Sequence, residues 1–301
     1  MKIGRSILRQ WDLQLMVIPA IIFIFVFSYI PMYGILIAFQ DYDIFQGFYK
    51  SPWIGLDNFK EFLNASEFLT IMRNTLAISF LKLLIGFPAP ILLALLLNEV
   101  RIPLFKRVVQ TISYLPHFLS WVIVSGFVMT ILSADYGSLN IALEKLNLID
   151  EPVNWLTIPN YFWTILITTG LWKGVGFSSI VYLAAISGVN PDLYEAASID
   201  GASRFRKIYL ITIPCIMPVI AIFLILAIGD LLSAGFEDIL LLQSDIVRDI
   251  SDVLDTYVYR VGIRNSLFSY AAAVGLFKAI ISIVLLTIAN FAARRSGNSL
   301  W

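Results

Sequence analysis

The segment that decides the fold runs from Tyr194 to Pro214 and reads YEAASIDGASRFRKIYLITIP. It begins with a short polar, alanine-rich turn carrying three basic residues, and a long apolar segment lies on each side of that turn. The whole chain of 301 residues is 59% hydrophobic, with mean hydropathy +0.83. Soluble domains average about 45–50% apolar residues. The turn is therefore expected to connect two membrane spans.

Six apolar blocks are each long enough to cross a hydrocarbon core, which takes about 20 helical residues. Backbone groups in lipid must be hydrogen-bonded within their own segment, so each block is expected to be helical. The expected spans cover residues 13–40, 74–97, 108–134, 161–186, 208–234 and 270–293. The first span is expected to be retained, because its apolar run is too long for a signal peptide. These blocks predict an all-α polytopic membrane protein with one transmembrane domain over residues 1–301.

Basic residues are unequally distributed between the connecting segments. The N-terminal tail, the C-terminal tail and the loops 98–111 and 187–207 hold 11 of the 21 Lys and Arg residues. The three other loops are longer in total and hold only 7; they cover residues 41–73, 135–160 and 235–269. Because short loops rich in Lys and Arg stay in the cytoplasm, both termini and the 187–207 loop are expected to be cytoplasmic.

The cytoplasmic loop has the signals of a short helix followed by a sharp turn. Asn190 can cap a helix whose first residue is Pro191, and Gly201 permits the left-handed conformation that ends one. Ser203 can cap the next helix, which Pro214 is expected to kink. The first helix has roughly ten residues and a length of about 15 Å. The loop is thus predicted to be a compact knob attached to the fifth span.

Two interpretations of this knob are open from the residues alone. Ala196 and Ala197 leave a low surface that a partner's groove can approach closely, while the basic residues at 204, 206 and 207 can meet acidic partner groups or lipid phosphates. In this first interpretation, a partner protein that binds the knob displaces the membrane helix attached to it. The alternative is an ordinary amphipathic helix that lies at the membrane interface.

The spacing of the loop resembles a known motif. Glu195-Ala196-Ala197 is followed after three residues by Gly201, and nine residues later by the run Ile211 to Pro214. This pattern is similar to the EAA loop of permease subunits in bacterial binding-protein-dependent ABC importers, except that Ile213 replaces the usual Leu. Further segments resemble the oligosaccharide and polysaccharide branch of the sugar permeases: IPMYGILIAFQDYD (30–43), ALLLNEV (94–100), QTISYLPHFLSWV (110–122), DTYVY (255–259) and the terminal SLW.

The resemblance implies a maltose-permease-like subunit in the bacterial cytoplasmic membrane, surrounded by lipid, that imports an oligosaccharide by alternating access. The implied partners are a second homologous permease, two cytoplasmic ATPases that bind the EAA helix, and an extracytoplasmic sugar-binding protein; nucleic acid is not among them. ATP and Mg are expected on the ATPases, with no cofactor, metal or catalytic residue on this chain. The implied ATPase-coupling residues are Glu195, Ala196, Ala197, Asp200, Gly201, Arg204 and Pro214.

Charged residues inside the spans are candidates for the translocation path, because a charge at the bilayer centre is costly and usually faces the bundle interior. They are Lys82, Lys173, Asp230 and Lys278. One interpretation is that the lysines snorkel or form structural ion pairs. The other is that three lysines against one aspartate leave the spans positive, and that an acidic oligosaccharide, such as one containing uronate, supplies the missing charge.

Two other functional classes fit less well. An ion-gradient-driven secondary transporter is the main alternative, but it predicts paired intramembrane carboxylates, and only Asp230 is a candidate. A membrane-embedded enzyme needs a cluster of His, Asp or Glu, and the chain has one histidine, His117, and one cysteine, Cys215. No G-x-x-x-x-G-K-[ST] motif occurs, so ATP is not expected to bind this chain through a P-loop.

Overall fold

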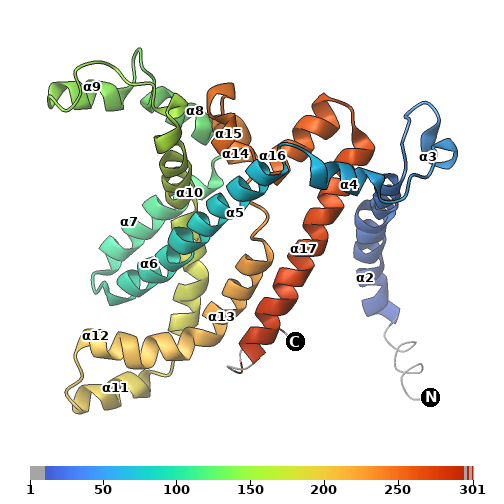
Figure 1. Ribbon diagram of the computed structural model, residues 1–301. Coiled ribbons are helices and arrows are strands. Elements are labelled where there is room, and N and C mark those ends of the chain that lie inside the picture. The colour runs from blue at the N-terminus through green and yellow to red at the C-terminus, as the bar shows by residue number, and fades with distance from the viewer. Residues whose placement is uncertain (1–10, 295–296, 298–299, 301) are drawn as a thin grey trace. The chain divides into compact units, whose positions relative to one another are not determined.

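The computed structural model describes residues 11–294, 297 and 300. The basic residues Lys2, Arg5 and Arg9, which contribute to the topology prediction, lie outside the described residues, as do the two ends of the SLW tail. The regular structure of the described part is helical, with one isolated antiparallel bridge between Gln40 and Trp53. The prediction of an all-α protein is confirmed for these residues (Figure 1).

Five helical runs are long and apolar enough to span a membrane, and they match five of the six expected spans. They cover Gln14–Phe39, Phe68–Glu99, Pro159–Ser187, Arg204–Gly229 and Phe268–Arg294. The fifth span differs at both ends from the expected 208–234. It begins in the basic turn at Arg204, because Ser203 caps it, and it ends at Gly229, so that Asp230 lies just beyond the helix.

The third expected span, 108–134, is bent and does not form one continuous helix; the two helices in it are long and apolar enough to cross a membrane only when they are counted together. Helix α7 (Pro103–Tyr114) continues into the short 3-10 helix η3 (Leu115–Phe118), and α8 (Trp121–Ile131) follows at an angle of 102°. Pro116 has no N–H to donate and restricts the residue before it. Ser120 then adopts an extended conformation and its side chain accepts a hydrogen bond from Ile123 N, which starts a new helix.

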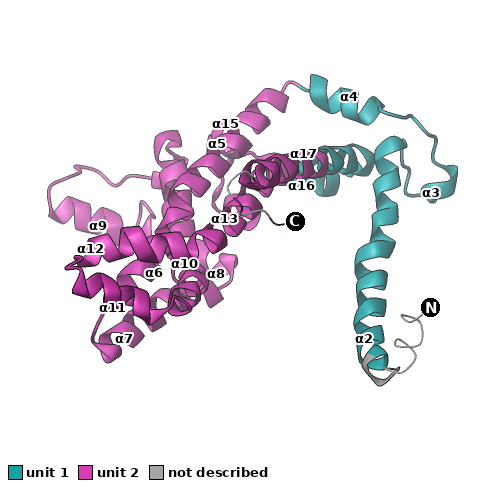
Figure 2. Ribbon diagram, turned by 90° about the horizontal axis from the view of Figure 1, so that it is seen from below, with its two compact units in different colours: residues 1–65, 258–277 teal, residues 66–257, 278–301 magenta. Residues whose placement is uncertain are grey.

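The described residues divide into two compact units, coloured separately in Figure 2. Unit 1 comprises residues up to Ala65 and Val258–Phe277, and unit 2 comprises Ser66–Tyr257 and the residues from Lys278 onwards. The helices of unit 1 are α2 (Trp11–Ile24), the π-helix η1 (Phe25–Tyr29), the 3-10 helix η2 (Ile30–Phe39), α3 (Gly47–Lys50), α4 (Asp57–Asn64), the π-helix η7 (Arg260–Arg264) and the start of α17 (Phe268–Arg294).

Unit 1 is held together around α4. Phe62 is 1% exposed, and its ring meets those of Phe277 and Tyr270 edge-on at 5.4 and 6.3 Å. The Asn58 amide donates to the carbonyls of Ala38 and Gln40 at 2.9 and 3.1 Å. These bonds satisfy backbone groups at the end of η2, where the helical ladder stops.

Unit 2 contains the remaining helices. They are α5 (Phe68–Gly86), α6 (Pro88–Glu99), α7, η3, α8, α9 (Ser138–Lys145), η4 (Trp155–Thr157), α10 (Pro159–Ser187), α11 (Pro191–Ile199), α12 (Arg204–Lys207), the π-helix η5 (Ile208–Thr212), α13 (Ile213–Gly229), α14 (Glu237–Leu242), η6 (Asp245–Val247), α15 (Arg248–Ser251), α16 (Leu254–Tyr259) and the end of α17.

Helix α10 is the central element of unit 2. Its N-terminal half packs Phe162 and Leu166 against Ile78 and Ile239, and its C-terminal half packs Tyr182 and Ile186 against α6 and α13. At Gly176 an added Cβ would lie 2.0 Å from the carbonyl oxygen of Ser113 on α7, so this position must be glycine for the two helices to pack. Of the two glycines in the GVG run at 174–176, Gly176 is thus required for helix packing, whereas a Cβ at Gly174 would meet nothing within 4 Å.

The segment from Phe236 to Tyr257, which lies in the expected loop 235–269, is folded into unit 2. Val253 and Leu254 are fully buried and Tyr257 is 3% exposed. The Asn74 amide on α5 donates to the carbonyls of Asp249 and Asp252. The segment is therefore anchored on α5, and its carboxylates reach the spans.

Candidate functional site

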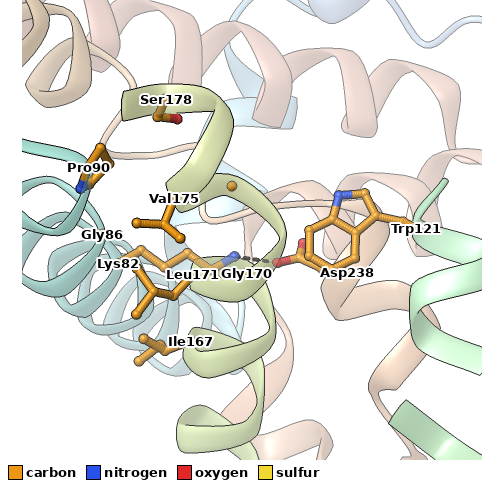
Figure 3. A pocket seen from close by; sticks show the side chains of 11 residues that line it. Lys82, Gly86, Pro90, Trp121, Ile167, Gly170, Leu171, Val175, Ser178 and Asp238 are labelled. Carbon is orange, nitrogen blue, oxygen red and sulfur yellow. Dashed lines mark hydrogen bonds and ion pairs between the residues drawn. The ribbon is translucent and has the colours of Figure 1, made fainter. Parts of the chain in front are cut away.

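One cavity of unit 2 lies between α5, α6 and α10, and α14 and α8 contribute its remaining wall (Figure 3). Its volume is about 300 Å³. Helix α10 lines it with one face, at residues 167, 170, 171, 174, 175 and 178. Three of these positions carry Gly or Ser, which leaves the space open. The polar side of the cavity is formed by Lys82, Asp238 and Trp121.

Lys82 forms an ion pair that the span sequences alone did not predict, because its partner, Asp238, lies in the expected loop 235–269. Its Nζ lies 2.5 Å from Oδ2 of Asp238 and donates to the carbonyl of Ala234 at 2.6 Å. Asp238 is 3% exposed, whereas the Lys82 side chain is 27% exposed and faces the cavity. An ammonium has three donors, so one N–H of Lys82 is left for a ligand.

Gly235 makes this ion pair possible. Its φ is +106°, and an added Cβ would lie 2.3 Å from Oδ1 of Asp238 and 2.7 Å from Nζ of Lys82. The residue is thus glycine for two reasons: the left-handed backbone favours it, and the ion pair occupies the space of a side chain.

Two further cavities, each of about 350 Å³, adjoin the first one at Gly86, which lines all three. One continues past Lys82 to Ser79 and Asp230. The other is lined by four aromatic rings, those of Phe87, Phe177, Tyr182 and Phe223. Gly86 is the last residue of α5, and α6 begins two residues later. The three cavities lie around this junction, between α10 and α13.

The 187–207 loop has the local geometry that its sequence predicts. Asn190 Oδ1 accepts a hydrogen bond from Asp192 N, and α11 starts at Pro191. Gly201 has a φ of +73°, and Ala202 N closes the helix end by donating to Ala197 O at 2.8 Å. Ser203 then caps α12, which continues through η5 into α13. Glu195 and Ala196 are exposed on α11, and a third exposed side chain, Ile199, ends it.

Comparison with known proteins identifies the family. Residues 86–298 match the family described as binding-protein-dependent transport system inner membrane component. This match covers more than two thirds of the chain and includes α6, α10 and α14 of the cavity wall and the 187–207 loop. The chain belongs to this family of transport permeases. The family resemblance that the sequence motifs indicated is confirmed.

Several individual relatives of the permease cover almost its whole length. It is 45% identical over 292 residues to the polygalacturonan/rhamnogalacturonan transport system permease protein YteP of Bacillus subtilis, covering 97% of this chain and 90% of that one. It is 42% identical to Protein LplB of the same organism, covering 95% and 89%.

Two solved structures have the same fold. One is the crystal structure of a bacterial ABC transporter involved in the import of the acidic polysaccharide alginate, with a TM-score of 0.90, 43% identity and coverage of 98% and 99%. The other is a bacterial alginate ABC transporter in complex with an alginate pentasaccharide-bound periplasmic protein, with a TM-score of 0.90, 42% identity and 99% coverage of both chains.

The permease pairs two of its three intramembrane lysines with carboxylates, which corrects the charge balance expected from the sequence. Lys278 lies 2.5 Å from Oδ1 of Asp255, as Lys82 does from Asp238. Asp230, expected to be the available acid, makes no ion pair among the described residues; it lies at the exposed end of α13. The sequence missed the two partners because both come from the segment taken to be an outside loop.

Lys173 of the permease has no carboxylate partner in the described part of the chain. Its Nζ donates to the carbonyl of His117 at 2.8 Å and lies 5.4 Å from the centre of the Trp121 ring. His117 in turn stacks on Phe177 at 3.9 Å. The lysine thus satisfies a carbonyl at the break in the third span, where a cation is favourable at a helix C-terminus.

Proposed function

We propose that the chain is the transmembrane permease subunit of an ATP-driven importer for acidic oligosaccharides. The observation that carries this proposal is the similarity, at 42–45% identity over nearly the whole chain, to proteins named for polygalacturonan/rhamnogalacturonan transport and for alginate import. The polysaccharides in these names consist partly or wholly of uronic acids, so the shared chemistry is a sugar chain that carries carboxylates.

The three joined cavities support a path for such a substrate. Sugar rings have apolar faces that suit aromatic side chains, and Phe87, Phe177, Tyr182 and Phe223 provide these on one side of Gly86. Lys82 provides a cation on the other side. A carboxylate that accepts the free N–H of Lys82 gains a charge-assisted hydrogen bond, which is stronger than a neutral one. Lys82 and Asp230 thus belong to the proposed path, and Lys173 and Lys278 support the helices around it.

The partners in this proposal are a second permease, two cytoplasmic ATPases and an extracytoplasmic binding protein that delivers the sugar. The ATPases dock on α11 through Glu195, Ala196 and Ala197. Asp200 and Gly201 form the turn that directly follows α11. Arg204 and Pro214 lie at the start of the fifth span, which is displaced when the ATPases move α11. This arrangement requires both termini and α11 to lie in the cytoplasm and residues 135–160 to lie outside.

Reconstitution tests the proposal directly. The permease is purified with the second permease, ATPase and binding protein encoded beside it and placed in proteoliposomes. We expect uptake of uronate-containing oligosaccharides that needs both ATP and the loaded binding protein, with little uptake of neutral oligosaccharides of the same length. Uptake driven by a proton or sodium gradient in the absence of ATP would show that the chain is a secondary transporter instead.

A further inference from the structure

Four polar residues form a closed ring of hydrogen bonds across the elbow between α11 and the fifth span. The Tyr194 hydroxyl lies 2.9 Å from the Thr212 hydroxyl, which lies 3.5 Å from the Lys207 carbonyl as a weak further contact. The Lys207 ammonium donates to the Ser198 hydroxyl at 2.6 Å, and Ser198 donates back to the Tyr194 carbonyl at 2.6 Å. The ring therefore starts and ends at Tyr194.

The ring matters because the turn between α11 and α12, at residues 200–203 and here called the elbow, is itself only loosely held. Residues 200–203 are held by few bonds, chiefly those that end α11 at Ala197 and Ser198, and an added Cβ at Gly201 would meet nothing within 4 Å. A glycine in an uncrowded turn can rotate at little steric cost. Without a second connection, a force on α11 would be absorbed by rotation at this turn. The ring provides that second connection.

Thr212 places the ring at the base of a long helix. It is 1% exposed and is the last residue of η5, directly before α13. Helix α13 reaches the cavities at Phe223 and Ala227, and Ala227 lies about 22 Å along the helix from Thr212 at 1.5 Å per residue. A displacement of Thr212 therefore moves the wall of the cavity as long as α13 moves as a rod.

We propose that Tyr194, Ser198, Lys207 and Thr212 form a coupling brace that makes α11 and the start of the fifth span move as one body. The proposal rests on the proposed function, in which the ATPases act on α11. The brace transmits their movement past the Gly201 hinge into α13. Its four members are positioning residues: they touch neither the sugar nor the nucleotide, and only Lys207 of the four carries a charge.

The brace is tested by a double-mutant cycle in the reconstituted complex. Tyr194→Phe and Thr212→Val each remove one hydroxyl with little change in shape. The quantity measured is the number of sugars imported per ATP hydrolysed. We expect it to fall about fivefold in either variant, which corresponds to ~1 kcal/mol for one hydrogen bond. The double variant should be no worse than either single one, because both remove the same bond.

Two variants serve as matched controls. Thr212→Ser keeps the hydroxyl and should restore the ratio of sugar to ATP. Tyr209 lies in η5 beside the brace, is 72% exposed, and its hydroxyl has no hydrogen bond among the described residues, so Tyr209→Phe should leave the ratio unchanged. A normal ratio in Tyr194→Phe, or equal losses in Tyr194→Phe and Tyr209→Phe, would overturn the proposal.

A second measurement tests the brace independently of ATP-driven transport. Spin labels are attached to cysteines at Leu193 on α11 and Met217 on α13, both exposed, in a Cys215→Ser background. We expect one narrow distance distribution in the otherwise unchanged complex and a clearly broader one in Tyr194→Phe. An unchanged distribution would show that the elbow is rigid without the brace. If instead the distribution broadens but no ATP-dependent uptake occurs in the parent complex, the proposed function fails and the brace stands.

Discussion

The ammonium of Lys82 on α5 lies 2.5 Å from the carboxylate of Asp238 on α14, across a separation of 156 residues in the chain. This pair joins a membrane span to a segment that looks like an external loop in the sequence. It also forms the polar wall of the cavity between α5, α6 and α10. The same contact therefore determines both how the segment is anchored and which charges line this cavity.

Lys82→Met is expected to destabilise the complex. It leaves the carboxylate of Asp238, which is 3% exposed, without its partner. Removing one member of a fully buried pair costs about 3–5 kcal/mol, and we expect the lower end because the Lys82 side chain is 27% exposed. Thermal unfolding of the purified complex measures the loss.

The double variant Lys82→Met/Asp238→Leu should recover most of that stability, because no buried charge is left unpaired. Lys60→Met is the control: its pair with Asp57 is exposed on both sides, and such pairs contribute about 0–1 kcal/mol. Equal losses in the single and double variants would show that Lys82 stabilises through packing alone.

Substrate charge discrimination should depend on Lys82 and not on Lys278. Lys82 lines two of the cavities, whereas Lys278 pairs with Asp255 and lines none of the three joined at Gly86. We expect Lys82→Met to lower the ratio of uptake between a uronate oligosaccharide and its carboxyl-reduced neutral form about tenfold, the value of one charge-assisted hydrogen bond. Lys278→Met should keep this ratio. Identical ratios in the two variants would remove Lys82 from the path.

Gly235→Ala is expected to separate the Lys82–Asp238 pair. The new Cβ would lie within 2.7 Å of both charged groups, and φ is +106° at this residue. We expect a loss of stability similar to that of Lys82→Met and little further loss when the two are combined. Gly126→Ala, in helix α8 with nothing within 4 Å of its Cβ, should be tolerated. Additive losses in the combined variant would argue that Gly235 acts only through its backbone.

Gly201→Val should give an assembled complex that no longer imports sugar in response to ATP. The left-handed φ of +73° at Gly201 disfavours a β-branched residue. The backbone of the turn at residues 200–203 must therefore change its conformation to accommodate valine. Gly201→Asn, which tolerates this conformation, should retain much of the activity. Gly188→Ala is the control, because its φ is −83° and its Cβ would make only an ordinary contact. Sugar-stimulated ATP hydrolysis at the normal level in Gly201→Val would contradict the prediction.

Cysteine labelling tests the orientation. In a Cys215→Ser background, needed because Cys215 is exposed, a cysteine at Ser187 should react only from the cytoplasmic side. One at Lys145, exposed on α9, should react only from outside. The reverse pattern of labelling would invert the whole topology.

The sequence by itself determined the elements that depend on local chemistry. Apolar length predicted six spans, and five of them are single long helices, because a helix that satisfies its own backbone is the form such a segment takes in lipid. The caps at Asn190 and Ser203 and the left-handed Gly201 were predicted for the same reason: each depends on residues within a few positions of it. The family motif in this loop is equally local. The break in the third span was open to the same reasoning, since Pro116 and Ser120 mark it.

Only the tertiary structure decided how distant charges are paired. Asp238 and Asp255 reach Lys82 and Lys278 because the segment from Phe236 to Tyr257 folds back onto α5, where Asn74 and Thr75 bind its backbone. No local pattern specifies that contact, because it depends on shape and on hydrogen bonds between residues more than 150 positions apart. Counting charges within the spans therefore gave a surplus of positive charge, although most of it is neutralised by carboxylates from outside the spans.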